Sequence, residues 1–218
     1  MSASIAELCL VVLLFWIVMA KTWLIGVDEV GRGPLAGPVV VGAVAVPIGF
    51  DWSLLPGVAD SKTLSALKRE MISKRVEEVS LSEELYCAVS FVSARVIDKS
   101  GISQAIKVAI KRSLGRIMSE TKCGAETMMI KLDGGLYAPQ EFKDQETIKG
   151  GDGSEKVIGL ASVVAKVRRD RYMVNVAKSF PAYNFATHKG YGTPDHCRAI
   201  RLYGLSSLHR ATFCRKLL

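Results

Sequence analysis

Two adjacent carboxylates, Asp28 and Glu29, stand between two apolar segments of the chain. Apolar residues 23–27 precede them and apolar residues 39–46 follow, and short apolar runs bounded by Gly and Pro predict buried strands. Two charges where a buried strand ends are costly unless a cation shares the site. Neighbouring strand side chains face opposite ways, so both acids can serve one metal site only if the strand twists or ends there.

The turn after these acids carries Gly31, Arg32 and Gly33. Glycines leave main-chain amides open to close approach by a ligand, and an arginine can donate a fork of hydrogen bonds to a phosphate. Carboxylates for a metal beside groups for a phosphate indicate phosphodiester chemistry. The structural alternative is a tight hairpin with a solvated acidic pair.

Two further acids follow similar patterns. Asp133 ends the apolar run 127–132 and precedes two glycines, and Asp152 lies in the glycine-rich segment 147–154. In α/β proteins, sites gather at the carboxyl ends of strands, although an isolated Asp-Gly there is more often a turn. Four acids with few histidines and no cysteine cluster favour Mg²⁺ or Mn²⁺. Two such ions can activate a water and stabilise the leaving oxygen of a phosphodiester.

Several elements must position these acids. Residues 85–92 predict another strand, and apolar spacing predicts helices over 66–79, 102–118 and 159–177. The first helix is expected to bury a stripe formed by Leu67, Met71, Ile72, Val76 and Val79. The last is expected to place basic residues on its exposed side, namely Lys166, Arg168, Arg169 and Arg171.

The charge of the chain favours a polyanionic partner. The formal net charge is +8 over 218 residues, which raises the expectation of nucleic-acid binding without proving it. Ser61 and Lys62, just before a predicted helix, could contact a phosphate, and so could Lys166. Tyr191 lies between two glycines in an aromatic-rich loop, which suits stacking on a base or sugar; the alternative is a loop fixed to the core.

Other chemistries lack their motifs. The chain has no Walker Gly-Lys-Ser/Thr loop and no Gly-x-Ser-x-Gly nucleophile elbow. Its five cysteines are scattered, with no Cys-x-x-Cys pair, and indicate free thiols in a reducing compartment. A metal-dependent nuclease or phosphotransferase acting on nucleic acid is the prediction from the residues alone.

Residues 5–20 are almost wholly apolar. The uninterrupted part is shorter than the roughly 20 residues that a membrane span needs, and no Lys or Arg precedes it. The interpretations are an element packed on the core, which we favour, a weak membrane anchor, or a retained targeting segment. We therefore expect an apolar N-terminal segment at 1–20 and one domain at 21–218.

Several segments together resemble the signature of ribonuclease HII, in family order over nearly the whole chain from residue 23. They are residues 28–38, 60–65, 130–134, 161–171 and 188–193. The resemblance implies a ribonuclease H-like α/β fold, with a mixed central sheet flanked by helices and a C-terminal helical extension. It implies hydrolysis of the RNA strand of RNA–DNA hybrids. It also implies cutting on the 5′ side of single ribonucleotides embedded in duplex DNA, leaving 3′-hydroxyl and 5′-phosphate ends.

Carried over by motif position, the resemblance implies a role for each candidate residue. Asp28, Glu29, Asp133 and Asp152 would be the metal-binding catalytic carboxylates, working with Mg²⁺ or Mn²⁺. The turn at 31–33 would read the 2′-hydroxyl and hold the phosphate, and Tyr191 would stack on the following deoxyribose. This pairing would discriminate an RNA-to-DNA junction, because the 2′-hydroxyl marks RNA.

The chain departs from the family pattern before Asp152, where Lys149-Gly150-Gly151 holds one residue more than expected. The spacing from Asp152 to Ser162 fits the family, so the extra residue is assigned to the preceding loop. Asp144 and Asp170 are weaker alternatives for the fourth acid.

The competing hypotheses are a non-catalytic nucleic-acid-binding protein of the same fold and a junction-blind nuclease. We expect a cytoplasmic monomer without a clear sliding-clamp peptide. Membrane contact through residues 5–20 is conceivable but not favoured.

Overall fold

The computed structural model describes residues 23–58 and 64–217, and these form a mixed five-stranded sheet in the order β3-β2-β1-β4-β5. β1 pairs antiparallel with β2 and parallel with β4, while β3 is antiparallel to β2 and β5 is parallel to β4. The strands are β1 (Trp23–Val30), β2 (Val39–Pro47), β3 (Tyr86–Val92), β4 (Met128–Asp133) and β5 (Gln145–Ile148).

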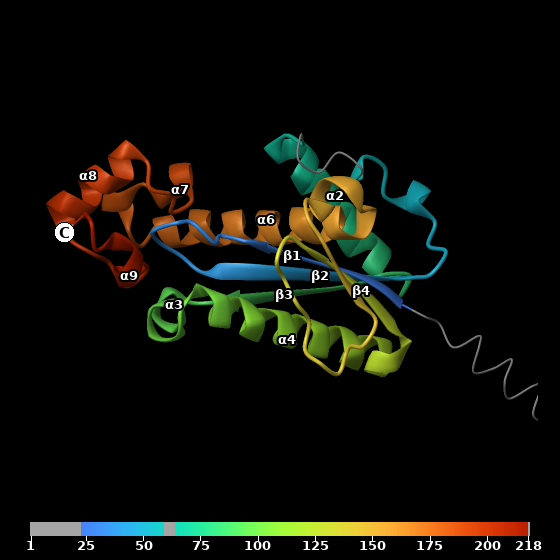
Figure 1. The fold of residues 1–218 in the computed structure, drawn as a ribbon. Helices are drawn as coiled ribbons and strands as arrows, with labels where there is room; N and C mark the ends of the chain where they lie inside the picture. The colour runs from blue at the N-terminus through green and yellow to red at the C-terminus, as the bar shows by residue number, and fades with distance from the viewer. Residues whose placement is uncertain (1–22, 59–63, 218) are drawn as a thin grey trace, which may run out of the picture.

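Helices cover both faces of this sheet (Figure 1). α4 (Ile102–Thr121) packs on one face with alternate side chains of β1, β2 and β4. α6 (Lys156–Ala177) packs on the other face, and α2 (Ala66–Ser80) lies against it. The shorter helices are η1 (Trp52–Leu54), α3 (Ala94–Ser100), η3 (Ala125–Thr127), α5 (Gly151–Ser154), η4 (Pro181–Tyr183), α7 (Phe185–His188), α8 (Pro194–Tyr203) and α9 (Ala211–Cys214). The expected α/β fold is confirmed.

Two strand glycines let α6 lie close to the sheet. A Cβ added at Gly26 would overlap the main chain of Val157, and one at Gly42 would come within 2.5 Å of the Ala161 carbonyl oxygen. The absence of side chains at these positions brings β1, which carries Asp28 and Glu29, and its neighbour β2 directly against the helix.

The C-terminal helices pack at one end of the sheet, beside the turn that follows β1 (Figure 1). Main-chain hydrogen bonds join the two regions: Leu35 N–H donates to Gly190 O at 2.9 Å, and Gly37 N–H donates to Leu208 O at 2.8 Å. The helical extension therefore fixes the glycine-rich turn from behind.

The structure corrects four details of the sequence prediction. β1 does not end before the acids but continues through both of them to Val30. Leu67 and Met71 do not join the buried stripe of α2, since they are 73% and 64% exposed. Arg169 is fully buried rather than exposed. β5 and α3 were not predicted.

Residues 1–22 and 59–63 lie outside the described residues, so the interpretations of the apolar segment 5–20 stay predictions. Within residues 23–58 and 64–217, no helix is long and apolar enough to cross a membrane.

Candidate active site

Parallel pairing of β1 with β4 brings Asp28 and Asp133 to the same edge of the sheet. The last paired residues are Val27 and Leu132, so each acid stands one position beyond that pair. Asp133 is the last residue of β4, whereas Asp28 remains paired with Gly42 of β2 on its other side. The strand-end pattern therefore places these two candidates together.

Asp28 is buried, with 6% of its surface exposed. Burial raises the pKa of its carboxyl to about 7, and the neighbouring charges of Glu29 and Asp133 add to this, while a hydrogen bond with Ser162 of α6 opposes it. Its Oδ1 also accepts from the Glu29 amide at 2.7 Å. An acid desolvated beside two others is a position that a bound cation would stabilise.

Glu29 is paired with an arginine from the turn. Arg32 Nη1 donates to Glu29 Oε1 at 3.0 Å, and the arginine side chain is 56% exposed while that of Glu29 is 13% exposed. Burial raises the pKa of Glu29 above its ordinary value, and the bond from Arg32 opposes that shift. The guanidinium of Arg32, the candidate for phosphate contact, thus already lies against Glu29.

Asp152 lies in α5, directly beside Asp133. The Asp152 amide donates to Asp133 Oδ1 at 3.3 Å. The preceding Gly150 has φ 73°, a left-handed conformation that suits glycine, and it forms the bend between β5 and α5. The assignment of the extra residue to the loop before Asp152 stays a prediction.

The donor set fits a hard divalent ion. Its members are carboxylates from β1, β4 and α5, and Mg²⁺ is commonly held by one or two carboxylates together with water and a substrate phosphate. No group of three or more acid, histidine or cysteine side chains is already arranged to hold a metal within the described part of the chain.

Tyr191 and Lys166 lie together on the C-terminal side of the site. The Tyr191 ring is 42% exposed, with Lys166 Nζ at 5.9 Å and Arg169 Cζ at 5.8 Å from its centroid. Lys166 also pairs with Asp170 at 2.9 Å. Both cations lie over the ring, where its π electrons attract positive charge. The exposed part of Tyr191 can contact a ligand.

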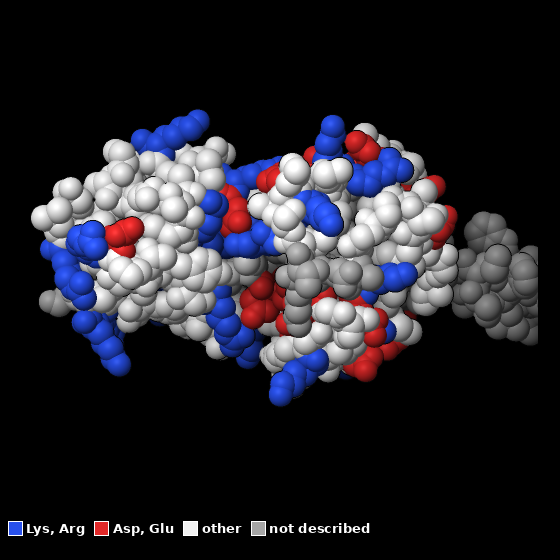
Figure 2. Space-filling model, turned by 90° about the horizontal axis from the view of Figure 1, so that it is seen from above, with Lys and Arg blue, Asp and Glu red and all other residues white. Residues whose placement is uncertain are grey.

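A basic groove of about 500 Å³ runs between α2 and α6. Four cations line it, Arg69, Lys166, Arg171 and Lys189, against the two acids Glu70 and Asp170. Figure 2 shows acidic side chains gathered between the C-terminal helices and the rest of the molecule, with Lys and Arg side chains on both sides. None of the four candidate carboxylates lines the groove itself, so its cations suit contact with the backbone of a polyanion rather than the reaction.

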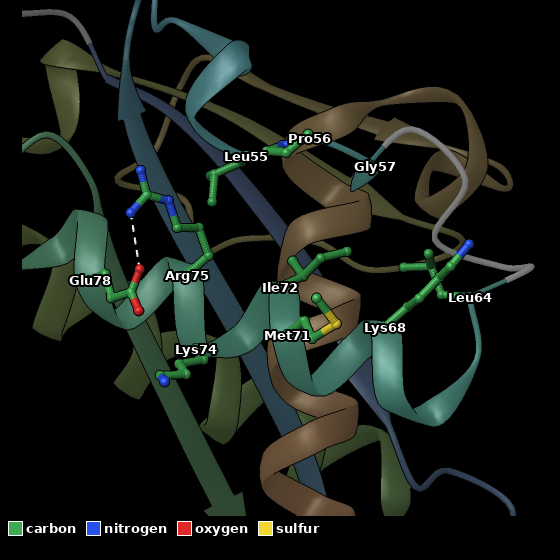
Figure 3. A pocket seen from close by; sticks show the side chains of 10 residues that line it. All are labelled: Leu55, Pro56, Gly57, Leu64, Lys68, Met71, Ile72, Lys74, Arg75 and Glu78. Atoms are coloured by element: carbon green, nitrogen blue, oxygen red, sulfur yellow. Dashed lines mark hydrogen bonds and ion pairs between the residues drawn. The ribbon is translucent and has the colours of Figure 1, made fainter.

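A second groove lies away from these acids. It has a volume of about 740 Å³, and α2 and the Leu55–Gly57 segment line it with a mixture of apolar and basic side chains, including Leu55, Met71, Ile72 and Lys74 (Figure 3). None of the four candidate carboxylates contributes to it, so we do not assign the chemistry there.

Sequence reasoning did not find three residues that contact the site or its turn: Ser162, Arg169 and Arg210. Both arginines are fully buried. Arg169 lies in α6 and Arg210 in the loop before α9, and no hydrophobic periodicity in the sequence indicates that either is buried. Ser61 and Lys62 lie outside the described residues, so their proposed phosphate contact is untested.

The chain matches known proteins over most of its length. A family model described as Ribonuclease HII matches residues 25–216. A ribonuclease HII from Geotalea daltonii is 44% identical over 190 residues, which is 87% of this chain and 82% of that protein. One from Endomicrobium trichonymphae is 39% identical over 188 residues, covering 86% and 83%.

Solved structures show the same fold. The ribonuclease HII of a PCNA complex from Archaeoglobus fulgidus superposes with a TM-score of 0.66 at 23% identity, covering 89% of this chain and 96% of that one. Bst-RNase HIII in complex with Mn²⁺ gives 0.66 at 19% identity, covering 90% and 69%. With a family model spanning nearly the whole described domain and relatives at 39% and 44% identity, the chain belongs to the ribonuclease HII family of endoribonucleases.

Proposed function

We propose that this enzyme is a metal-dependent endonuclease that cuts the RNA strand of RNA–DNA hybrids and the 5′ side of single ribonucleotides in duplex DNA. The products would carry 3′-hydroxyl and 5′-phosphate ends. The observation that supports this most strongly is that Asp28, Glu29 and Asp133 lie together at the carboxyl ends of β1 and β4. The glycine-rich turn with Arg32 lies beside them.

The four carboxylates are assigned to Mg²⁺ or Mn²⁺. Bound there, the ions would activate water and stabilise the leaving oxygen. Asp28 and Glu29 would contribute from β1, Asp133 from the end of β4 and Asp152 from α5. The neighbour Bst-RNase HIII was solved with Mn²⁺, which supports this assignment by likeness of fold.

Recognition is assigned to the turn and to Tyr191. Main-chain groups of Gly31, Arg32 and Gly33 would contact the 2′-hydroxyl and the phosphate. The exposed face of Tyr191 would stack on the next deoxyribose, where a 2′-hydroxyl would be in the way. Reading a ribose on one side and a deoxyribose on the other would select the junction.

The basic side chains are assigned to the nucleic-acid backbone. Lys166 would contact a phosphate from α6, and Ser61 and Lys62 would do so from the segment before α2. A monomeric active form stays a prediction. A cytoplasmic location stays a prediction.

The test uses an RNA–DNA hybrid labelled on the RNA strand. We expect cleavage by the wild-type enzyme with Mg²⁺ or Mn²⁺ and no cleavage with EDTA. Cleavage that persists in EDTA would contradict the metal assignment. Binding without cleavage in either metal would indicate a non-catalytic nucleic-acid-binding protein. If a DNA duplex with one ribonucleotide is cut equally on both sides of that ribonucleotide, the enzyme would be a junction-blind nuclease.

A further inference from the structure

Arg210 is fully buried. Among the hydrogen bonds of the described residues, its guanidinium donates only to the glycine-rich turn, residues 31–38. Its Nη2 donates to Gly31 O at 2.6 Å, its Nη1 to Arg32 O at 3.0 Å and its Nε to Gly37 O at 3.0 Å. Within residues 23–58 and 64–217 it forms no salt bridge. Burial of charge is normally offset by an opposite charge. The acceptors of Arg210 are instead neutral carbonyls, while the Phe213 ring lies 5.1 Å from its Cζ and the charge of Asp98 acts against the lowering of its pKa by burial.

The contacts to Gly31 and Arg32 fix the direction of two amides. In a planar trans peptide, the carbonyl oxygen of one residue and the N–H of the next point in opposite directions. Holding the Gly31 and Arg32 oxygens toward Arg210 therefore turns the N–H groups of Arg32 and Gly33 away from it.

Those two amides belong to residues at the surface. Arg32 and Gly33 are exposed, and a Cβ added at Gly33 would meet nothing within 4 Å. Across the described residues, neither amide donates to another protein group. Both donors remain available to a ligand.

A second buried arginine joins this turn to the Tyr191 loop. Arg169 Nε donates to Pro38 O at 3.0 Å, its Nη2 to Ala36 O at 3.2 Å and its Nη1 to Lys189 O at 2.9 Å. Lys189 is two residues before Tyr191. One guanidinium thus sets the spacing between the turn and the aromatic ring.

We propose that Arg210 is a positioning residue for recognition of the ribose, holding the turn so that the Arg32 and Gly33 amides point at the substrate, with Arg169 fixing the distance to Tyr191. This rests on the proposed function, in which the turn reads the 2′-hydroxyl. Arg210 itself lies behind the turn and touches no substrate.

The test is the Arg210→Lys variant, which keeps the charge and removes the planar fork. Long-range attraction for the DNA backbone should persist, whereas two of the three carbonyls lose their donor. The measurement is the Kd for a DNA duplex with one ribonucleotide and for the all-DNA duplex of the same sequence, both in EDTA so that cleavage does not intervene. The ratio of these constants reports ribose recognition alone.

The control is Leu114→Ala, which removes buried side-chain volume in α4, against the opposite face of the sheet. It should lower Tm without altering the turn. For Arg210→Lys we expect the ratio to fall about tenfold, corresponding to loss of roughly one well-placed hydrogen bond, while all-DNA binding stays within about twofold. Arg169→Lys should lower the ratio as well.

The other outcomes are distinct. A wild-type ratio near one would refute reading of the 2′-hydroxyl, and the positioning role with it. A clear wild-type ratio that Arg210→Lys leaves unchanged would overturn the positioning role alone. Equal weakening of both constants would do so too, since that is the behaviour of a merely structural residue.

Discussion

The main-chain amide of Asp152 donates a hydrogen bond to Asp133 Oδ1 at 3.3 Å. Two acids separated by a strand and a bend are thereby held side by side through one backbone group. The bond uses the main chain of residue 152 and one side-chain oxygen of residue 133, so it does not require the Asp152 side chain.

This contact makes Asp133→Asn a precise test of charge. An asparagine Oδ1 still accepts from the Asp152 amide, so the fold and the position of α5 should persist while the negative charge is lost. We expect cleavage to fall by about 100-fold or more, the usual range for loss of a catalytic electrostatic group, with Tm little changed. Asp144→Asn, at an exposed acid in the segment before β5, is the matched control. Loss of activity in that variant instead would reassign the site.

The charged form of Asp28 should lower the stability of the fold while serving the reaction. It is buried beside Glu29 and Asp133, and its raised pKa shows that the fold disfavours its charged form. Asp28→Asn should therefore increase the free energy of unfolding at pH 8 in EDTA by about 1–3 kcal/mol and abolish cleavage. Urea denaturation measures the first effect. A less stable variant that retained activity would argue against Asp28 as a functional acid.

Gly42 should be intolerant of a side chain because a Cβ there meets the Ala161 carbonyl oxygen at 2.5 Å. Gly42→Ala is expected to cost about 2–3 kcal/mol of stability through overpacking. Gly115 of α4 has no atom within 4 Å of such a Cβ, so Gly115→Ala should stabilise the protein by about 0.5–1 kcal/mol. Chemical denaturation of the pair gives opposite signs. Similar destabilisation by both would contradict close packing of α6 on β2.

The three histidines of the chain lie together, buried, in the C-terminal part of the fold: the His188 ring stacks on that of His196 at 4.3 Å, and His196 is joined to His209. His196 Nε2 and His209 Nε2 lie 3.0 Å apart, His196 Nδ1 lies 2.8 Å from Tyr191 O, and His209 Nδ1 accepts from the Ser206 amide at 2.8 Å. These partners assign neutral rings: Nδ1–H of His196 donates to the carbonyl, and Nε2–H of His209 donates to His196. Adding a proton would break one of these bonds.

Burial lowers the pKa of His209 to about 4 and that of His196 below its ordinary value. The unfolded chain takes up these protons near pH 6.5, so the contribution of the two histidines to stability, present at pH 7.5, should be lost as the pH drops through the window from 6.5 to about 4. For His209 alone we expect a loss of about 2 kcal/mol by pH 5. Because the raised pKa of Asp28 contributes with the opposite sign over the same pH range, the measurement is the difference in urea stability between the wild type and His209→Gln at each pH. That difference should change by about 2 kcal/mol between pH 7.5 and pH 5, and a difference that is the same at both pH values would contradict the assignment.

The sequence predicted the acids better than their supports. Asp28 and Asp133 could be found because each follows an apolar run, and parallel strands bring such positions together. Asp152 depended on the family spacing, since a short glycine-rich segment has no periodicity of its own.

The buried arginines could not be predicted from the residues. Arg169 lies among Arg168, Asp170 and Arg171, where charge predicts exposure. Its burial follows from tertiary contacts with the turn after β1 and with the segment that holds Lys189. The predicted burial of Leu67 and Met71 was wrong for the opposite reason. Helical spacing indicates an apolar face but does not say how much of that face the tertiary structure covers.

The most direct test of the account follows one cut in one substrate. A DNA duplex with a single ribonucleotide, labelled at the 5′ end of that strand, is incubated with the wild-type enzyme and Mg²⁺, and the product is sized to one nucleotide. The account predicts one product, ending in a 3′-hydroxyl immediately before the ribonucleotide, and no product from the all-DNA duplex. Cutting at other positions, or equal cutting of the all-DNA duplex, would contradict it.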